Sequence, residues 1–268
     1  MAKERLDVLL VNRGFYDSRE KAKRAIMAGL VFSESDRLDK PGMKIPTDLQ
    51  LKVKGDDLPY VSRGGLKLEK AIECFELDIE EKIVLDIGAS TGGFTDCALQ
   101  HGAQKVYALD VGYNQLHWKL RQDPRVVVME RTNFRYVQAD DLVYGLPDLA
   151  TIDVSFISLK LILPVLYLVL KTEGHVMTLI KPQFEAGREQ VGKKGIVCDP
   201  YIHEQVIQTI LDFSVEQGFS VDGLQYSPIT GGEGNIEFLL YLKKSAGKPQ
   251  VMNAPVTHTI QAAHRHFT

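Results

Sequence analysis

Four charged side chains stand in or beside apolar stretches of the chain. Asp153 and Lys181 each end a run typical of a buried strand, and Glu237 lies inside a third such run. Lys67 lies on the helix before the first strand, after the turn at residues 63–65. An ionised side chain in an apolar strand is costly unless another charge is paired with it. We therefore predict that the four residues converge on one rim and form a catalytic site. Taken singly, each could instead be a solvated charge at the end of an element.

A glycine-rich loop supplies a second chemical signal. Residues 86–94, Asp-Ile-Gly-Ala-Ser-Thr-Gly-Gly-Phe, follow an apolar strand and open a helix. Gly88 permits a tight turn, and Gly92 and Gly93 would let a ligand approach the backbone closely. Asp110 ends the next strand, where a carboxylate can bind both hydroxyls of a ribose. This arrangement predicts a nucleoside-containing cofactor.

The loop differs from a dinucleotide-binding loop in a way that favours a cationic ligand. Dinucleotide sites use Gly-x-Gly-x-x-Gly, whereas this loop reads Gly-x-x-x-Gly-Gly and is preceded by Asp86. That carboxylate would repel a pyrophosphate but attract the amine and sulfonium of S-adenosylmethionine (SAM). We expect SAM; the alternative is a glycine turn that binds nothing. The predicted cofactor-binding residues, of which the last two belong to an adenine-side loop, are Asp86, Gly88, Ala89, Ser90, Thr91, Gly92, Gly93, Phe94, Asp110, Thr132 and Asn133.

The elements that must position these residues alternate between strands and helices from residue 61 onward. Strands are predicted at residues 83–88, 105–110, 126–129, 149–154, 176–180 and 236–242, and helices at 68–75 and 202–217. Such alternation predicts an α/β, Rossmann-like fold with a mostly parallel sheet and helices on both faces. Ligands of such sheets bind at the carboxyl ends of the strands, where the glycine loop and the charges fall.

Residues 1–60 have a different character. They contain twelve Lys and Arg against ten acids, and the basic residues bunch between positions 19 and 24. Three leucines at helical spacing predict a helix that ends at Gly14, and Asp17 or Ser18 can cap a second helix. Short strands are expected near residues 31–32 and 49–53. The second helix could follow a phosphate backbone or be a solvated surface helix, and its outer face carries Arg19, Lys23 and Arg24.

Composition limits the class of protein. The 268 residues are 44% hydrophobic and 25% charged, with a net charge of −3, so a disordered chain and a wholly basic nucleic-acid-binding protein are excluded. Three scattered cysteines, and histidines without ligand spacing, predict neither a disulfide framework nor a metal site. No apolar run reaches the ~20 residues of a membrane span, and no signal peptide is expected. We expect a cytoplasmic protein that does not bind membranes.

The N-terminal region resembles a known RNA-binding module. Arg-Leu-Asp at residues 5–7, Ser-Arg-x-x-Ala at 18–22, Ile-x-x-Gly-x-Val at 26–31 and Lys-Pro-Gly at 40–42 are similar to the module named after ribosomal protein S4. The resemblance implies a small α+β RNA-binding domain, in which Arg5 joins the basic residues that face RNA.

The four charges carry a second resemblance. In order and context they resemble the Lys-Asp-Lys-Glu tetrad of the FtsJ-like RNA ribose 2′-O-methyltransferases. Together with the S4-like module, the junction at residues 62–68 and the stretches 86–96, 153–158 and 179–185, they resemble the TlyA (haemolysin A-like) family over residues 3–243. The resemblance implies SAM-dependent 2′-O-methylation of cytidines in ribosomal RNA, with ribosomal RNA or ribosomal subunits as partners. It also implies an RNA-binding domain at 1–60, a methyltransferase domain at 61–244, a tail or short helix at 245–268, and an RNA-binding role for Arg63.

The implied reaction needs help to remove a proton, because a ribose hydroxyl is a poor nucleophile at neutral pH. Lys181 is the predicted base, since a lysine among positive and apolar neighbours can lose its proton near neutral pH. Asp153 would orient its amine, while Lys67 and Glu237 would hold the ribose and steer Lys181. Positioning alone, without a base, is the alternative.

Residues 183–199 form a long segment without clear periodicity. Such segments are often functional lids, and Arg188, Lys193 and Lys194 could meet RNA phosphates; a mobile surface loop is the alternative. Residues 230–235 are expected to be a hairpin connection before the strand with Glu237. Two other functions stay open at this point: a membrane-active haemolysin and a non-catalytic RNA-binding ribosome-assembly factor.

Overall fold

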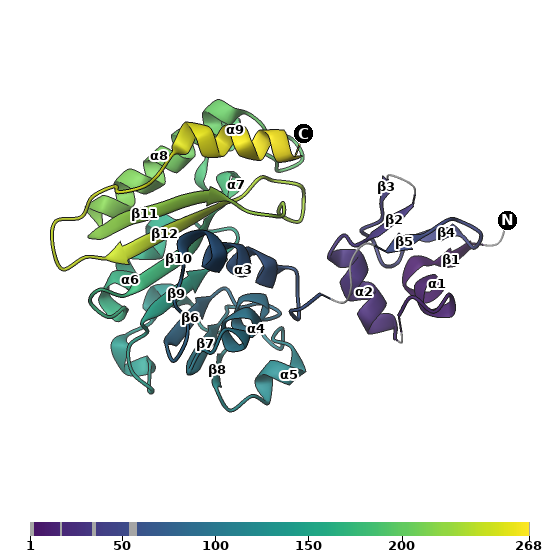
Figure 1. Ribbon diagram of the computed structural model, residues 1–268, viewed down its shortest axis with the longest axis horizontal. Helices are drawn as coiled ribbons and strands as arrows, with labels where there is room; N and C mark the ends of the chain where they lie inside the picture. Colours follow the sequence, from purple (N-terminus) through teal and green to yellow (C-terminus); the bar gives the residue numbers. More distant parts are fainter. Residues whose placement is uncertain (1–2, 17, 34–35, 54–57, 268) are drawn as a thin grey trace. The chain divides into compact units, whose positions relative to one another are not determined.

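The computed structural model describes residues 3–16, 18–33, 36–53 and 58–267 (Figure 1). The chain forms two compact units that divide between Arg63 and Gly64. Each unit has its own buried apolar cluster, so each is described by itself.

The first unit is a small α+β domain. Its elements are β1 (Lys3–Arg5), α1 (Leu6–Asn12), α2 (Arg19–Met27), β2 (Val31–Ser33), β3 (Asp36–Arg37), β4 (Lys44–Pro46) and β5 (Lys52–Val53). β1 pairs with β4, and β2 pairs with β3 and β5, all antiparallel. The hydroxyl of Ser18 caps α2 by accepting a hydrogen bond from the backbone N–H of Lys21 (3.3 Å); Asp17 lies outside the described residues. Leu6, Leu10 and Ile26 are fully buried between the helices and the strands.

The second unit is built around a seven-stranded sheet. The strands are β6 (Ile83–Ile87), β7 (Lys105–Leu109), β8 (Val126–Met129), β9 (Leu149–Ile152), β10 (His175–Ile180), β11 (Phe219–Tyr226) and β12 (Phe238–Lys244). The α-helices are α3 (Gly64–Phe75), α4 (Gly93–Gln100), α5 (Trp118–Arg121), α6 (Leu163–Val169), α7 (Pro182–Glu185), α8 (Pro200–Glu216) and α9 (Val256–Phe267). Short 3₁₀ turns are η1 (Phe134–Tyr136), η2 (Ala139–Asp141), η3 (Leu159–Leu161) and η4 (Arg188–Gln190).

The order of the strands creates a switch point in the middle of the sheet. The order is β11-β12-β10-β9-β6-β7-β8; the strands from β10 to β8 are parallel, and β12 is antiparallel to both of its neighbours. The chain runs from β6 through β7 to β8 and then crosses to β9 on the other side of β6. Ligands of open α/β sheets bind at such a point, beyond the carboxyl ends of the strands. The predicted Rossmann-like fold class is confirmed.

Helices cover the sheet and complete its core. In Figure 1, α3 and α4 lie side by side, and α8 packs against α9 and β11. Tyr107, Phe219 and Phe238 are among the largest fully buried side chains. Among the residues that the structure describes, no helix is both long and apolar enough to cross a membrane.

Among the differences from the predicted elements, three concern the sheet and the segment that follows β10. Strand β11 was not expected, because Gly223 and a register shift between Val221 and Gly223 interrupt its alternating pattern. Glu237 directly precedes β12 instead of lying inside it. The segment at 183–199 contains the helical turns α7 and η4, which are too short to give a periodic pattern.

Candidate active site

The four predicted charges, which we call the tetrad (Lys67, Asp153, Lys181 and Glu237), meet at one edge of the sheet. The amine of Lys67 donates hydrogen bonds to Oε2 of Glu237 (2.6 Å) and to Oδ2 of Asp153 (3.3 Å). The amine of Lys181 lies 2.5 Å from Oδ1 of Asp153. Asp153 thus bridges the two lysines, and the four side chains form one continuous chain of ion pairs.

Strand register explains why these distant segments meet. β9 and β10 are parallel neighbours, so Asp153 and Lys181, which directly follow them, emerge at the same edge. β12 runs antiparallel to β10 and places Phe238 opposite Ile180. Glu237 therefore reaches the same edge from the opposite chain direction.

Burial and charge pairing oppose each other within the tetrad. Burial disfavours the charged form of Lys67, but the carboxylates of Asp153 and Glu237 outweigh that effect and raise its pKa above the ordinary value. Burial also disfavours ionised Asp153, but Lys67 and Lys181 outweigh it and lower the pKa of Asp153. Lys67 is held as an ammonium ion between two carboxylates, whereas Lys181 bonds to one carboxylate of the tetrad.

Two residues that were not singled out from the sequence follow Asp153 within three positions along the chain. The hydroxyl of Ser155 accepts a hydrogen bond from the amine of Lys181 (3.2 Å). Phe156 has a left-handed backbone (φ 62°) and is 90% exposed, and its ring centroid lies 5.0 Å from that of Phe184. Left-handed backbone is costly for a bulky residue and concentrates at functional sites. The sequence hides this feature, because an aromatic residue after Asp153 looks like the continuation of a strand.

The glycine loop lies directly beside the segment with Asp153. Gly88 has φ 88°, and a side chain there would come within 2.5 Å of the backbone oxygen of Asp153. The carboxylate of Asp110 accepts hydrogen bonds from the backbone N–H groups of Ser90 (2.8 Å) and Gly112 (2.7 Å). Each carboxylate oxygen keeps a further lone pair, so Asp110 can still accept a ribose hydroxyl. The loop, Asp110 and the tetrad occupy the switch point of the sheet and fit a nucleoside cofactor.

Asp86 lies beneath the loop and does not face outward. Its carboxylate is 1% exposed and accepts hydrogen bonds from the hydroxyls of Thr95 (2.6 Å) and Thr151 (3.3 Å). Burial raises the pKa of Asp86 to about 7. This carboxylate ties α4 and β9 to β6, so it would act on a bound cation through the loop and not by direct contact.

For two other predicted cofactor-binding residues, packing within the protein explains the residue type. Gly92 has φ 97°, and a side chain there would collide with Leu116 and Leu120. Phe94 is buried in the core behind the loop. Cofactor contacts by Ala89, Ser90, Thr91 and Gly93 stay predictions.

Glu130 organises the loop after β8, although the sequence analysis gave it no role. Its carboxylate accepts hydrogen bonds from the backbone N–H groups of Asn114 (2.9 Å) and Gln115 (3.0 Å) and forms an ion pair with Arg121. Thr132 bonds through its hydroxyl to the backbone oxygen of Glu130 (3.1 Å), and the side chain of Asn133 caps η1. The two predicted adenine-side residues are thus held in a fixed turn.

In the first unit, Asp7 organises two predicted RNA-binding arginines. Its buried carboxylate accepts hydrogen bonds from Nε of Arg5 (2.9 Å) and Nη2 of Arg19 (2.9 Å). The hydrogen bond from Arg5, together with the nearby charge of Arg19, lowers the pKa of Asp7 to about 2. The cluster of three residues carries a net positive charge and holds both guanidinium groups at the surface.

The other predicted RNA-binding residues are spread over both units. Lys23 pairs with Glu20 on α2 (2.8 Å), and Arg24 is half-buried on the same helix. Arg63 is the last residue of the first unit. Three cations lie exposed on the segment after α7 of the second unit, namely Arg188, Lys193 and Lys194.

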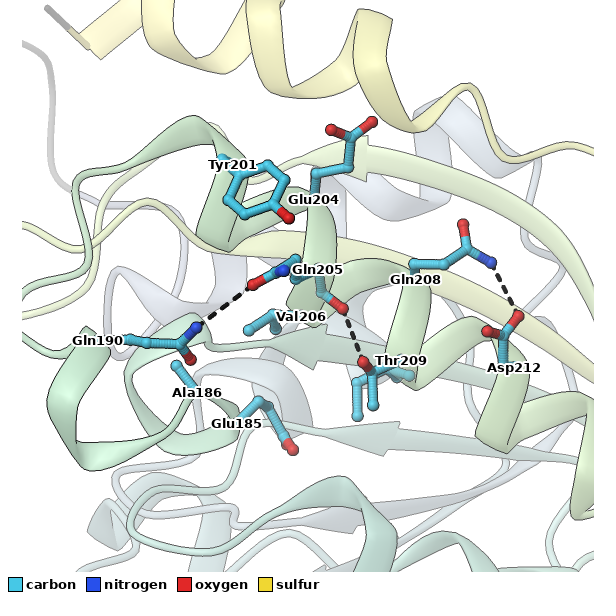
Figure 2. A pocket seen from close by; sticks show the side chains of 11 residues that line it. Glu185, Ala186, Gln190, Tyr201, Glu204, Gln205, Val206, Gln208, Thr209 and Asp212 are labelled. Carbon is cyan, nitrogen blue, oxygen red and sulfur yellow. Dashed lines mark hydrogen bonds between the residues drawn. The ribbon is translucent and has the colours of Figure 1, made fainter.

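A pocket of about 630 Å³ lies beside α8 (Figure 2). Its charged lining residues are Glu185, Glu204 and Asp212, all of them carboxylates. None of the predicted site residues lines this pocket, and its charge suits a phosphate backbone poorly. The tetrad and the glycine loop therefore remain the candidate site.

Together the sheet, the loop at its switch point and the buried tetrad define a methyltransferase. The model of the FtsJ-like methyltransferase family matches residues 60–244, and that of the S4 domain matches residues 4–51. SAM is the co-substrate that this class of enzyme implies. The chain belongs to the TlyA (haemolysin A) family, in which an S4 domain is joined to an FtsJ-like methyltransferase domain.

Relatives match nearly the whole chain. It is 60% identical to "Putative rRNA methyltransferase YqxC" of Bacillus subtilis, over 98% of this chain and 95% of the relative. It is 41% identical to the 16S/23S rRNA (cytidine-2′-O)-methyltransferase TlyA of Mycobacterium tuberculosis, over 89% of each chain. A solved structure, "Putative hemolysin from Streptococcus thermophilus", is 56% identical, with a TM-score of 0.80 and coverage of 100% of this chain and 98% of that one.

Proposed function

We propose that this protein is a SAM-dependent methyltransferase that modifies ribose 2′-hydroxyls of ribosomal RNA, with cytidine as the target nucleoside. The carrying observation is the tetrad: two amines and two carboxylates from four distant segments meet beside the glycine loop. The substrate is taken from the relatives, of which the Mycobacterium tuberculosis protein is named for cytidine 2′-O-methylation of ribosomal RNA. A cytoplasmic location follows from that substrate.

The cofactor would lie over the loop at residues 88–92, with Asp110 on its ribose and Thr132 and Asn133 near its base. SAM, when bound, supplies an electrophilic methyl group. The residues of this chain must bring the ribose oxygen into line with that group, and such alignment can contribute several kcal/mol, up to about 7–11 in ideal cases.

Lys181 is the proposed base. In its neutral form, the amine accepts the proton of the ribose hydroxyl, and Asp153 and Ser155 fix its direction through the contacts at 2.5 and 3.2 Å. Lys67 stays cationic and holds the carboxylates of Asp153 and Glu237 in place. A positioned general base contributes typically 10²–10⁴-fold, so it adds to alignment and does not replace it.

Phe156 is the proposed stacking surface for the target base. Its exposed ring stands three positions after Asp153 in the chain, and Phe184 supports it from α7. Stacking of a base on an aromatic ring is worth about 1–3 kcal/mol and is available to an unpaired nucleotide. The exposed cations Arg188, Lys193 and Lys194 would contact neighbouring phosphates.

The first unit would add affinity for the RNA backbone. Arg5 and Arg19, fixed by Asp7, together with Lys23 and Arg24, present positive charge to a phosphate chain. Arg63 is proposed to extend this set. Contacts of this kind position the RNA but do not select the nucleotide.

The test is to map ribose methylation in ribosomal RNA from cells with and without the gene, and from cells rescued with wild type or with Lys181→Ala. We expect at least one cytidine 2′-O-methyl group to disappear with the gene and to return only with wild type. An identical methylation map in all strains would overturn the proposal. Methylation lost at a base atom instead of a ribose would keep the enzyme class and overturn the target.

A further inference from the structure

His203 links the C-terminal helix to the segment that carries the exposed cations. It is fully buried on α8, and its Nε2 lies 3.1 Å from the backbone oxygen of Val197. Its Nδ1 lies 3.0 Å from Nε2 of His264 on α9. Because a carbonyl oxygen can only accept, Nε2 of His203 carries the hydrogen and donates it to Val197. In the neutral ring Nδ1 is then bare, so it accepts from His264.

Asn235 also forms hydrogen bonds with the same segment. Its side-chain oxygen accepts the backbone N–H of Val197 (3.0 Å), and its amide donates to the backbone oxygen of Gly195 (2.9 Å). Asn235 is 2% exposed and stands two positions before Glu237. Both polar backbone groups of Val197 are therefore bonded to buried side chains, one on α8 and one next to the tetrad.

The ring of His203 also packs beside the tetrad. It meets the ring of Phe238 edge-on, with centroids 5.4 Å apart, and Phe238 directly follows Glu237. A second attachment of the segment to α8 is the hydrogen bond from the amide of Gln190 to the side-chain oxygen of Gln205 (3.3 Å; Figure 2). The tip that bears Lys193 and Lys194 lies between these two attachments.

The buried environment favours the neutral ring of His203. Burial, and the proximity of His264, lower the pKa of His203 to about 4. At neutral pH the hydrogen-bond directions along His264, His203 and Val197 are therefore fixed.

We propose that His203 is a positioning residue that fixes the segment 187–197 and Glu237 to one another, and that His264 of α9 holds its ring in the orientation this requires. Helix α9 lies beyond residue 244, where the methyltransferase family model ends. The helix thus acts on the active site through a relay of side chains without contacting substrate. The effect on catalysis rests on the proposed function; the anchoring of the segment does not.

The test compares two substitutions at one position. His264→Leu removes the donor to His203, whereas His264→Gln keeps an N–H that can reach the same nitrogen. His258→Ala, at an exposed site on the same helix, is the matched control. Limited trypsin digestion with mass spectrometry measures cleavage after Lys193 and Lys194. We expect His264→Leu to raise that rate about tenfold, the size of one lost hydrogen bond, while His264→Gln and His258→Ala stay within about twofold of wild type.

Activity supplies the second readout. Single-turnover methyl transfer from radiolabelled SAM to ribosomal RNA should fall about tenfold in His264→Leu, with the Kd for SAM unchanged, and recover in His264→Gln. Asn235→Ser, which releases the segment without touching α9, should give the same cleavage pattern if His264→Leu proves too unstable to assay. Equal cleavage rates in wild type, His264→Leu and Asn235→Ser would overturn the proposal. If His264→Leu is cleaved faster but the wild-type protein transfers no methyl group to ribosomal RNA, the anchoring of the segment is supported and the proposed function is overturned.

Discussion

Each unit of this protein contains a carboxylate that lies between two cationic side chains: that of Asp153 is 21% exposed, and that of Asp7 is fully buried. Asp153 lies between Lys67 and Lys181, whose side chains are 7% and 9% exposed. Asp7 lies between Arg5 and Arg19, whose side chains are 45% and 53% exposed. In both clusters the carboxylate pairs with two cations, but the cations are shielded from solvent in the tetrad and exposed to it in the Asp7 cluster.

The difference in solvent accounts for the different role that we propose for each cluster. A buried amine exchanges protons under the control of its neighbours, because little water is present to screen them. An exposed guanidinium stays charged and can meet a phosphate, and a buried carboxylate fixes its direction in advance. This contrast agrees with the proposed roles, in which the tetrad acts on one atom and the Asp7 cluster contacts a polyanion.

The largest expected effect comes from removing the proposed base of the tetrad. Lys181→Ala should lower the rate of methyl transfer about 10²–10⁴-fold and leave SAM binding within about twofold, because the amine is proposed to act on the proton and not on the cofactor. Lys181→Arg should be nearly as inactive, since a guanidinium cannot serve as a base at neutral pH. Single-turnover transfer and calorimetric titration with SAM measure the two quantities.

The control for that experiment is Lys82→Ala, directly before β6 and at the opposite edge of the sheet, which should behave as wild type. Turnover of Lys181→Arg near the wild-type rate would rule out the base and leave positioning by the tetrad as the mechanism.

Next in size is the loss of the carboxylate that bridges the two lysines. Asp153→Asn leaves two buried ammonium ions with one remaining carboxylate partner from the tetrad, so the free energy of unfolding should fall by about 3–5 kcal/mol. Urea denaturation measures it. Asp148→Asn, which breaks the more exposed pair with Lys171, should cost about 0–1 kcal/mol. Equal losses for the two variants would mean that the tetrad does not lie in a low-dielectric environment.

The corresponding change in the first unit should cost less. Asp7→Asn should lower the free energy of unfolding by about 1–2 kcal/mol at pH 7. The loss is small because water can hydrate the two exposed guanidinium groups once the carboxylate charge is gone. The pKa of Asp7 is about 2, below its ordinary value of 3.8. Its stabilising effect is therefore complete above pH ~4 and is lost as the pH falls toward 2. Urea denaturation at pH 7 and pH 3 should show the gap between wild type and variant narrowing; a gap that widens in acid would contradict the assignment.

The smallest effect concerns RNA affinity. Arg19→Ala should weaken binding to ribosomal RNA fragments about equally for different sequences and reduce the slope of log K against log salt concentration by about 0.7–0.9. Filter binding at several salt concentrations measures the slope. Arg125→Ala, a matched arginine paired with Asp123 in the second unit, should leave the slope unchanged. A sequence-selective loss in Arg19→Ala would point to base contact instead.

The sequence by itself determined the features that depend on a few neighbouring residues. The Ser18 cap and the apolar spacing of Ala22 and Ile26 define α2. The glycine loop between β6 and α4 could be predicted because turn and cap signals are local in sequence. The four residues of the tetrad could be singled out because a charge in an apolar run needs a partner, whatever that partner is.

Only the tertiary structure decided which groups meet and which way they face. Asp86 turns into the core, whereas Asp110, which the same motif places near the cofactor, lies at the loop; no local pattern separates them. Glu237 reaches the tetrad because β12 runs antiparallel to β10. The contact between His203 and His264 exists because α9 packs on α8. Strand register and helix packing are set by the whole core, and the hydrophobic burial that drives them is non-directional. The partners of a buried polar group therefore cannot be predicted from the residues next to it in the sequence.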